Sequence, residues 1–177
     1  MEKKLHILIS GERGAGKSTL IEKLLAACPR PRYGFITKML PPDEEGFHPI
    51  YIHPADRPVW ERAYTEENRI GVCDSRTHRV NLAAFNILGV RYIRAARPGG
   101  IIVMDELGFL EAQAEDFTAA VLGALSGDIP VIAAVKSRTD IPFLNAVRAQ
   151  PRSEVFSITP ENRDALFEAL LPRMGQL

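Results

Sequence analysis

The sequence predicts an α/β protein whose central, mostly parallel sheet is flanked by helices. Three observations lead to this prediction. Short apolar runs, typical of strands buried on both faces of a sheet, recur through the second half of the chain. Amphipathic stretches of helical period separate these runs, and strands that alternate with helices need crossover connections that keep the strands parallel. A Gly-rich turn joins the first apolar run to the first amphipathic stretch.

The composition is that of an ordinary globular protein. A length of 177 residues is enough for one hydrophobic core. Of these residues, 46% are hydrophobic and 25% are charged, a composition that argues against disorder. Lys and Arg together number 22, as do Asp and Glu, so the basic excess typical of nucleic-acid-binding proteins is missing. We therefore interpret residues 1–177 as a single domain and do not expect nucleic acid as a partner.

Cysteine usage and hydropathy bear on the compartment. Cys28 and Cys73 lie far apart and form no CxxC pair, which suits a reducing environment. No apolar run reaches membrane-spanning length, and residues 1–5 lead into a strand-like segment without the apolar region of a signal peptide. We expect a cytoplasmic protein with no membrane partner.

The expected elements follow from the hydrophobic pattern and the turn residues. We expect strands over residues 6–9, 33–40, 47–53, 101–104, 131–135 and 155–158. We expect helices over residues 18–28, 81–97, 117–125, 143–149 and 159–171. The last helix is expected to begin with Thr159 as its N-cap and Pro160 at its first position. Residues 54–80 give no clear pattern and stay unassigned.

The Gly-rich turn fits the pattern GxxxxGK[ST] of a phosphate-binding loop. The nucleotide-binding residues that it predicts are Gly11, Glu12, Arg13, Gly14, Ala15, Gly16, Lys17, Ser18 and Thr19. Glycines let backbone N–H groups turn inward around phosphates, and the following helix adds its own free N–H groups. Lys17 can place its ammonium on the β- and γ-phosphates, and Ser18 can offer its hydroxyl to Mg²⁺. A chance Gly-rich turn is the alternative, and the position between a buried strand and an amphipathic helix argues against it.

Two acids follow the apolar run at residues 101–104. The carboxyl ends of parallel strands open onto the ligand crevice, so Asp105 is expected to bind Mg²⁺ there. Glu106 is then placed to orient or deprotonate a water that attacks the γ-phosphate. The alternative is that both acids only solvate a strand end.

Charge that develops on the γ-phosphate needs a cation. Lys136 and Arg138 follow the expected strand at residues 131–135, whose end also faces the crevice. Arg138 is our candidate for this catalytic role, and a solvated loop charge is the alternative.

With these residues in hand, the chain resembles the small P-loop nucleoside-triphosphatases of the thermophile type, a family with a human cancer-related member. The matching segments are residues 11–20, Gly34-Phe35-Ile36-Thr37, Gly46-Phe47, Val80-Asn81-Leu82 with Phe85, the run from Asp105 to Glu111, Pro142-Phe143 and residues 159–164. The resemblance implies one RecA-like P-loop domain that slowly hydrolyses several nucleoside triphosphates, ATP and GTP among them, with Mg²⁺. It also implies Asp105 near the metal, Glu106 as the water-activating base, and Asn162 and Arg163 at the ribose or base.

Three positions depart from the family pattern. Phe109 stands where a Lys is common, Asn86 where an acid is usual, and Glu45 lies in a segment where we expect an Arg. The usual basic residue near the γ-phosphate is therefore missing from its place.

Three functions remain open from the sequence. The first is hydrolysis of nucleoside triphosphates, which Glu106 favours. The second is a kinase that passes the γ-phosphate to a small acceptor, although its Arg-rich lid would have to lie within residues 57–79. The third is a nucleotide-dependent switch that acts on an unidentified protein partner.

Overall fold

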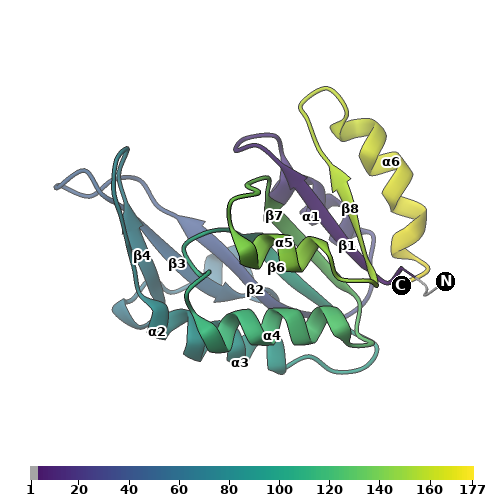
Figure 1. The fold of residues 1–177 in the computed structure, drawn as a ribbon, viewed down its shortest axis with the longest axis horizontal. Helices are drawn as coiled ribbons and strands as arrows, with labels where there is room; N and C mark the ends of the chain where they lie inside the picture. The colour runs from purple at the N-terminus through teal and green to yellow at the C-terminus, as the bar shows by residue number, and fades with distance from the viewer. Residues whose placement is uncertain (1–3) are drawn as a thin grey trace.

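Eight strands lie in one sheet in the computed structural model, which describes residues 4–177. Their order across the sheet is β5-β4-β3-β2-β6-β7-β1-β8 (Figure 1). The strands are β1 (His6–Gly11), β2 (Arg32–Met39), β3 (His48–Pro54), β4 (Arg69–Cys73), β5 (His78–Val80), β6 (Ile101–Leu107), β7 (Val131–Lys136) and β8 (Ser153–Ser157). The α-helices are α1 (Lys17–Ala26), α2 (Leu82–Ala84), α3 (Val90–Arg94), α4 (Glu115–Ser126), α5 (Pro142–Arg148) and α6 (Arg163–Met174).

The sheet has a parallel part and an antiparallel part. β1 pairs in parallel with β7 and β8, and β6 pairs in parallel with β2 and β7. β2, β3, β4 and β5 continue the sheet as an antiparallel meander. The predicted α/β fold with a mostly parallel sheet flanked by helices is confirmed, and within residues 4–177 no helix is long and apolar enough to cross a membrane.

The two faces of the sheet bury two separate apolar clusters. Successive side chains of a strand point to opposite faces, so Leu8 of β1 joins one cluster, and Ile7 and Ile9 join the other. The Leu8 face is covered by α3, α4 and α5, and the opposite face by α1 and α6. Because the parallel strands are covered on both faces, their apolar runs read continuously in the sequence.

The expected helix over residues 81–97 forms in three joined parts. Asn81 caps it by accepting the Ala84 N–H, and a π-helical turn, Phe85–Gly89, lies between α2 and α3. A side chain at Gly89 would collide with the Phe117 ring, so glycine lets this helix approach α4 closely. Asn86, a departure from the family pattern, accepts the Phe117 N–H at 3.0 Å and so satisfies a free donor in the first turn of α4.

Two expected boundaries differ in the structure. β6 does not end at Met104 but continues through both acids to Leu107, with a bulge between Met104 and Leu107. The prediction that α6 begins with Thr159 and Pro160 is wrong, because the helix begins at Arg163. The side chain of Asn162 accepts the Thr159 N–H and donates to the Ser157 carbonyl, which closes a turn ahead of the helix.

The unassigned segment, residues 54–80, contributes the outer part of the sheet. It forms two short 3-10 turns, Val59–Glu61 and Glu66–Asn68, followed by β4 and β5. These strands are short and lie at the sheet edge, where one face stays polar and no long apolar run is needed. In Figure 1 the meander extends away from α1 and α6.

A close approach of β2 to β6 gives a test of the fold. Gly34 has φ +87°, and an added Cβ would lie 2.1 Å from the Val103 carbonyl oxygen. Gly34→Ala should therefore lower the free energy of unfolding by more than about 2 kcal/mol, measured by urea denaturation. Gly123→Ala on α4 is the matched control, because its Cβ meets nothing within 4 Å, and it should be neutral or stabilising by up to about 1 kcal/mol. Equal stability of the two variants would contradict this account.

Candidate functional site

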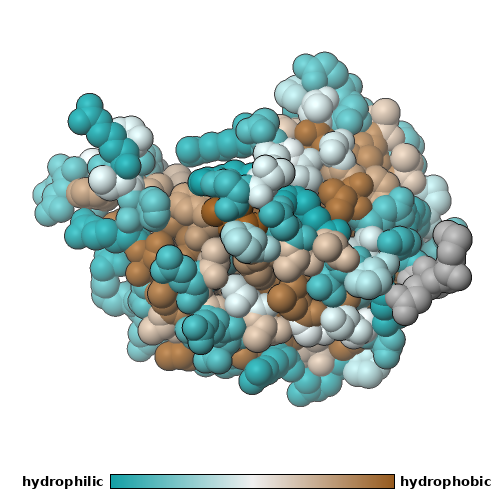
Figure 2. Space-filling model, in the orientation of Figure 1, coloured by the Kyte–Doolittle hydropathy of each residue, from teal (hydrophilic) through white to brown (hydrophobic). Residues whose placement is uncertain are grey.

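The carboxyl ends of β1, β7 and β6 meet at one edge of the sheet, at the top of Figure 1. The register pairs Gly11 of β1 with Lys136 of β7, and Val135 of β7 with Leu107 of β6. Figure 2 shows a hollow along this edge. The tips of the β2–β3 and β4–β5 hairpins lie on one side of it, and the loop before α6 lies on the other. The loop after β1, the acids of β6 and the end of β7 therefore surround one crevice.

The loop between β1 and α1 has the backbone of an anion cradle. Gly14 and Gly16 have φ +81° and +102°, a left-handed conformation that side chains disfavour. The first bond from this turn into α1 runs from the Leu20 N–H to the Gly16 carbonyl. The N–H groups of Lys17, Ser18 and Thr19 come before it and are free to bind an anion at the positive end of the helix.

Lys17 lies inside this cradle. Its ammonium donates to the carbonyls of Gly11 at 2.7 Å and Glu12 at 2.8 Å. Burial lowers the pKa of Lys17, while the carboxylate of Glu106 opposes this shift. Phosphate oxygens can take the place of these two carbonyls as acceptors.

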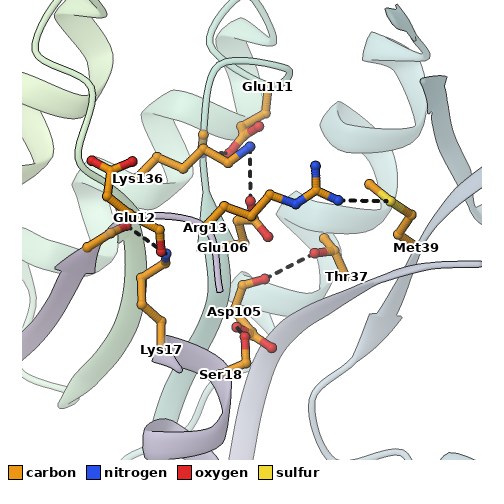
Figure 3. Close-up of polar contacts among 12 residues, drawn as sticks. Glu12, Arg13, Lys17, Ser18, Thr37, Met39, Asp105, Glu106, Glu111 and Lys136 are labelled. Atoms are coloured by element: carbon orange, nitrogen blue, oxygen red, sulfur yellow. Dashed lines mark hydrogen bonds and ion pairs between the residues drawn. The ribbon is translucent and has the colours of Figure 1, made fainter. Parts of the chain in front are cut away.

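A hydrogen bond joins the start of α1 to the acidic end of β6. The Ser18 hydroxyl donates to Asp105 Oδ1 at 2.7 Å, although 87 residues separate them in the chain. The Thr37 hydroxyl on β2 donates to the Asp105 carbonyl at 3.2 Å and holds this residue from the other side (Figure 3). Burial raises the pKa of Asp105, and the Ser18 hydrogen bond opposes the rise.

These oxygens fit a magnesium ion. Mg²⁺ prefers hard oxygen ligands and is commonly held by one or two carboxylates together with phosphates and waters. Ser18 and Asp105 supply a hydroxyl and a carboxylate beside the cradle, and a cation next to the half-buried carboxylate would favour its charged form. Among residues 4–177 no cluster of three or more His, Cys, Asp or Glu side chains is placed to hold a metal ion.

Glu106 lies at the crevice with a strained backbone. Its φ is +87°, the only left-handed residue other than glycine within residues 4–177. Its Oε1 forms an ion pair with the Lys136 ammonium at 3.0 Å (Figure 3). The same ammonium lies 4.9 Å from the centre of the Phe109 ring. Strain of this kind concentrates at functional sites, and here it accompanies the bulge that directs two successive acids to one edge.

The contacts of Arg138 are with residues outside the cradle. Its guanidinium binds Asp140 through two nitrogens and lies 5.3 Å from the centre of the Phe109 ring. Arg138 lines a groove of about 690 Å³ together with His78 and Phe143, and no cradle residue lines that groove. A catalytic role for Arg138 stays a prediction, and the cation beside Glu106 is Lys136.

Asn162 and Arg163 lie near the cradle from the other side. The turn before α6 follows β8, and the Arg163 Cδ lies 3.8 Å from where a Cβ on Gly16 would be. The Asn162 amide is occupied by Thr159 and Ser157, so its part in the turn is structural. Contacts of Asn162 and Arg163 with a ribose or base stay predictions.

Sequence reasoning gave no role to Glu111, which the structure places behind the site. This carboxylate is buried and accepts the Gly108 N–H, which closes the turn directly after β6. Burial raises its pKa to about 7. The available signal was its position, one acid between Leu110 and Ala112 in an apolar stretch that follows Asp105 and Glu106.

The sequence matches known proteins over most of its length. A family model described as NTPase matches residues 6–171. The nucleoside-triphosphatase THEP1 of Methanothermobacter thermautotrophicus is 30% identical, over 97% of this chain and 97% of that protein. The nucleoside-triphosphatase THEP1 of Aquifex aeolicus is 26% identical, over 94% of this chain and 97% of that protein.

Two solved structures share the fold. The crystal structure of THEP1 from Aquifex aeolicus matches with a TM-score of 0.73 at 22% identity, covering 96% of this chain and 98% of that one. The solution structure of a human cancer-related nucleoside triphosphatase matches with a TM-score of 0.69 at 22% identity, covering 97% of each chain. The chain thus shares its overall fold with two proteins of known structure.

The buried carboxyl of Glu111 predicts a pH effect on stability. Its folded pKa of about 7 lies above the ordinary 4.5, so the folded state binds more protons and is favoured at low pH. As pH rises from 4.5 through about 7, this contribution, on the order of 3 kcal/mol, should be lost. Glu111→Gln keeps an oxygen that accepts from Gly108 and should lack this loss, as measured by urea denaturation across the range. Parallel pH profiles of the two proteins would show that Glu111 is not buried as a neutral acid.

Proposed function

Because the chain belongs to the NTPase family, we propose that it hydrolyses nucleoside triphosphates to the diphosphate and phosphate with Mg²⁺. The observation that carries the proposal is the 2.7 Å hydrogen bond between Ser18 and Asp105. It joins a phosphate cradle to an acidic strand end whose next residue, Glu106, faces the same crevice. The substrates we propose are ATP and GTP, bound within a single domain over residues 1–177.

Binding would use the cradle for the phosphates. The N–H groups at the start of α1 and the ammonium of Lys17 would surround the β- and γ-phosphates. Ser18 and Asp105 would hold Mg²⁺, which supplies positive charge against the phosphate oxygens when bound. Arg163 lies beside Gly16 at the other end of the loop, where its planar guanidinium can stack on a base.

The chemistry needs a water and a base on the far side of the γ-phosphate. Glu106 has one carboxylate oxygen in the ion pair with Lys136, which leaves the other free to accept from a water. The ion pair with Lys136 fixes the direction of this carboxylate. Glu106 would take the proton of the attacking water, as a general base.

Hydrolysis is favoured over the two alternatives. Residues 57–79, the only place for a kinase lid in the sequence, form two 3-10 turns and the outer strands of the sheet. A switch that only stores a nucleotide has no need of a second carboxylate beside Asp105. An unidentified protein partner remains compatible with slow hydrolysis.

We also propose that the protein works in the cytoplasm. Cys28 and Cys73 are both free, which suits a reducing compartment.

Substitution of the two neighbouring acids tests the proposal. Glu106→Gln keeps the shape and removes the charge, so phosphate release from ATP or GTP should fall by about 10²–10⁴-fold while binding persists. The unhydrolysed triphosphate should then remain bound and be recovered by chromatography. Asp105→Asn should instead raise the Mg²⁺ concentration needed for half-maximal rate, because it removes the metal carboxylate.

Glu168→Gln is the matched control, because this glutamate is exposed on α6 and away from the crevice. It should release phosphate at the wild-type rate. If Glu106→Gln also does so, the hydrolytic role of Glu106 is wrong and transfer to an acceptor becomes the better account.

A further inference from the structure

Hydrolysis at this edge of the sheet needs a positively charged side chain close to the γ-phosphate. Charge spreads over the equatorial oxygens of the transferring phosphoryl group, and an arginine placed there accelerates the reaction strongly. The family pattern has a basic residue at two places, and this chain has Phe109 at one and Glu45 at the other. Another cation must therefore reach the same place.

Most cations around the crevice already have partners. Lys17 donates to the carbonyls of Gly11 and Glu12, Lys136 pairs with Glu106, and Arg138 pairs with Asp140. Arg13 differs from these, because no carboxylate within residues 4–177 lies within ion-pair distance of it. Its one polar contact is a weak one, from a guanidinium nitrogen to the Met39 sulfur at 4.0 Å.

The topology fixes what lies beneath the Arg13 side chain. Arg13 follows β1, Met39 ends β2, and the sheet order between these strands is β2-β6-β7-β1. Three strand spacings separate them, about 14 Å, so the loop and the side chain must cross the ends of β7 and β6. Asp105 and Glu106 lie at the end of β6. Figure 3 shows the side chain of Arg13 extending from the cradle toward Met39.

A γ-phosphate held by Lys17 and by the ion at Ser18 and Asp105 would therefore lie under this guanidinium. Arginine presents two parallel N–H donors that match two phosphate oxygens, and such charge-assisted bonds are far stronger than the contact with a thioether. Exposure of Arg13 leaves its side chain free to change partner without unfolding the loop.

We infer that Arg13 is a catalytic residue that contacts the γ-phosphoryl oxygens and stabilises the charge of the transition state. The inference rests on the proposed hydrolysis. In that step the water oxygen bonds to the γ-phosphorus, and the bond from phosphorus to the bridging oxygen breaks with its electron pair going to the diphosphate. The water proton goes to Glu106, and Arg13 stays charged throughout and transfers no proton.

The test compares Arg13→Ala with Arg13→Lys, with the rival Arg138→Ala, and with Arg94→Ala as a control, since Arg94 is exposed at the end of α3. For each we would measure kcat, the Kd of a non-hydrolysable triphosphate, and the Kd of the diphosphate with Mg²⁺ and aluminium fluoride, which mimics the transferring phosphoryl group. Arg13→Ala should lower kcat by at least about 100-fold and weaken the fluoride complex similarly. The triphosphate Kd should stay within about threefold, because the charge matters in the transition state.

Two further results separate a catalytic from a structural role. Free guanidinium ion should restore part of the activity of Arg13→Ala and leave the wild type unchanged, and Arg13→Lys should recover only part because it lacks the fork. An unchanged kcat and fluoride complex in Arg13→Ala, or a loss found in Arg138→Ala instead, would overturn the inference while hydrolysis stands. Failure of the wild type to release phosphate would sink the proposed function, and the fluoride complex would still report on Arg13.

Discussion

The parallel pairing of β1, β7 and β6 is the constraint on which the rest of the site depends. Parallel strands that share a register end at the same edge, so a glycine loop, a lysine and two acids meet there. The Ser18 to Asp105 hydrogen bond then ties the start of α1 to the end of β6. Ser18 and Asp105 are 87 positions apart along the chain, so the strand register is what brings their side chains into contact.

Charge balance within the crevice follows from the same arrangement. Lys17 and Lys136 bring positive charge to an edge where Asp105 and Glu106 bring negative charge, and each ammonium has an oxygen partner. A triphosphate can exchange the carbonyl partners of Lys17 for phosphate oxygens, while Glu106 keeps its own lysine. The carboxylate that we propose as the base, Glu106, and the ammonium that we propose to bind phosphate, Lys17, are thus held by separate contacts.

Much of the parallel half was predictable because its strands are buried on both faces. Apolar runs such as residues 101–104, bounded by turn residues, indicate buried strands, and the cradle pattern is expected between a strand and a helix. The outer strands β4 and β5 were not predicted, since they are short, polar on one side and paired only through the sheet. The start of α6 was misplaced because Asn162 closes a turn that the Thr159-Pro160 pattern imitates.

The sequence predicts which residue types meet at the site, but it predicts the orientation of their side chains less well. Asp105 and Glu106 could be placed at a strand end, but the left-handed backbone of Glu106 depends on the bulge between β6 and β7. Arg138 was expected to be the cation because it follows β7; in the structure Asp140, two residues later, binds its guanidinium, and the catalytic role stays a prediction. The catalytic role that we propose for Arg13 could not be predicted from the sequence, because it depends on which strands lie between β1 and β2.

Hydrolysis with Mg²⁺ in water enriched in ¹⁸O tests the central claim most directly. ATP and GTP would be incubated with the wild-type protein, and phosphate and diphosphate would be analysed by mass spectrometry. The account predicts one ¹⁸O atom in each released phosphate and none in the diphosphate, because water attacks the γ-phosphorus at Glu106. Label in the diphosphate, or no phosphate release from either nucleotide, would contradict it.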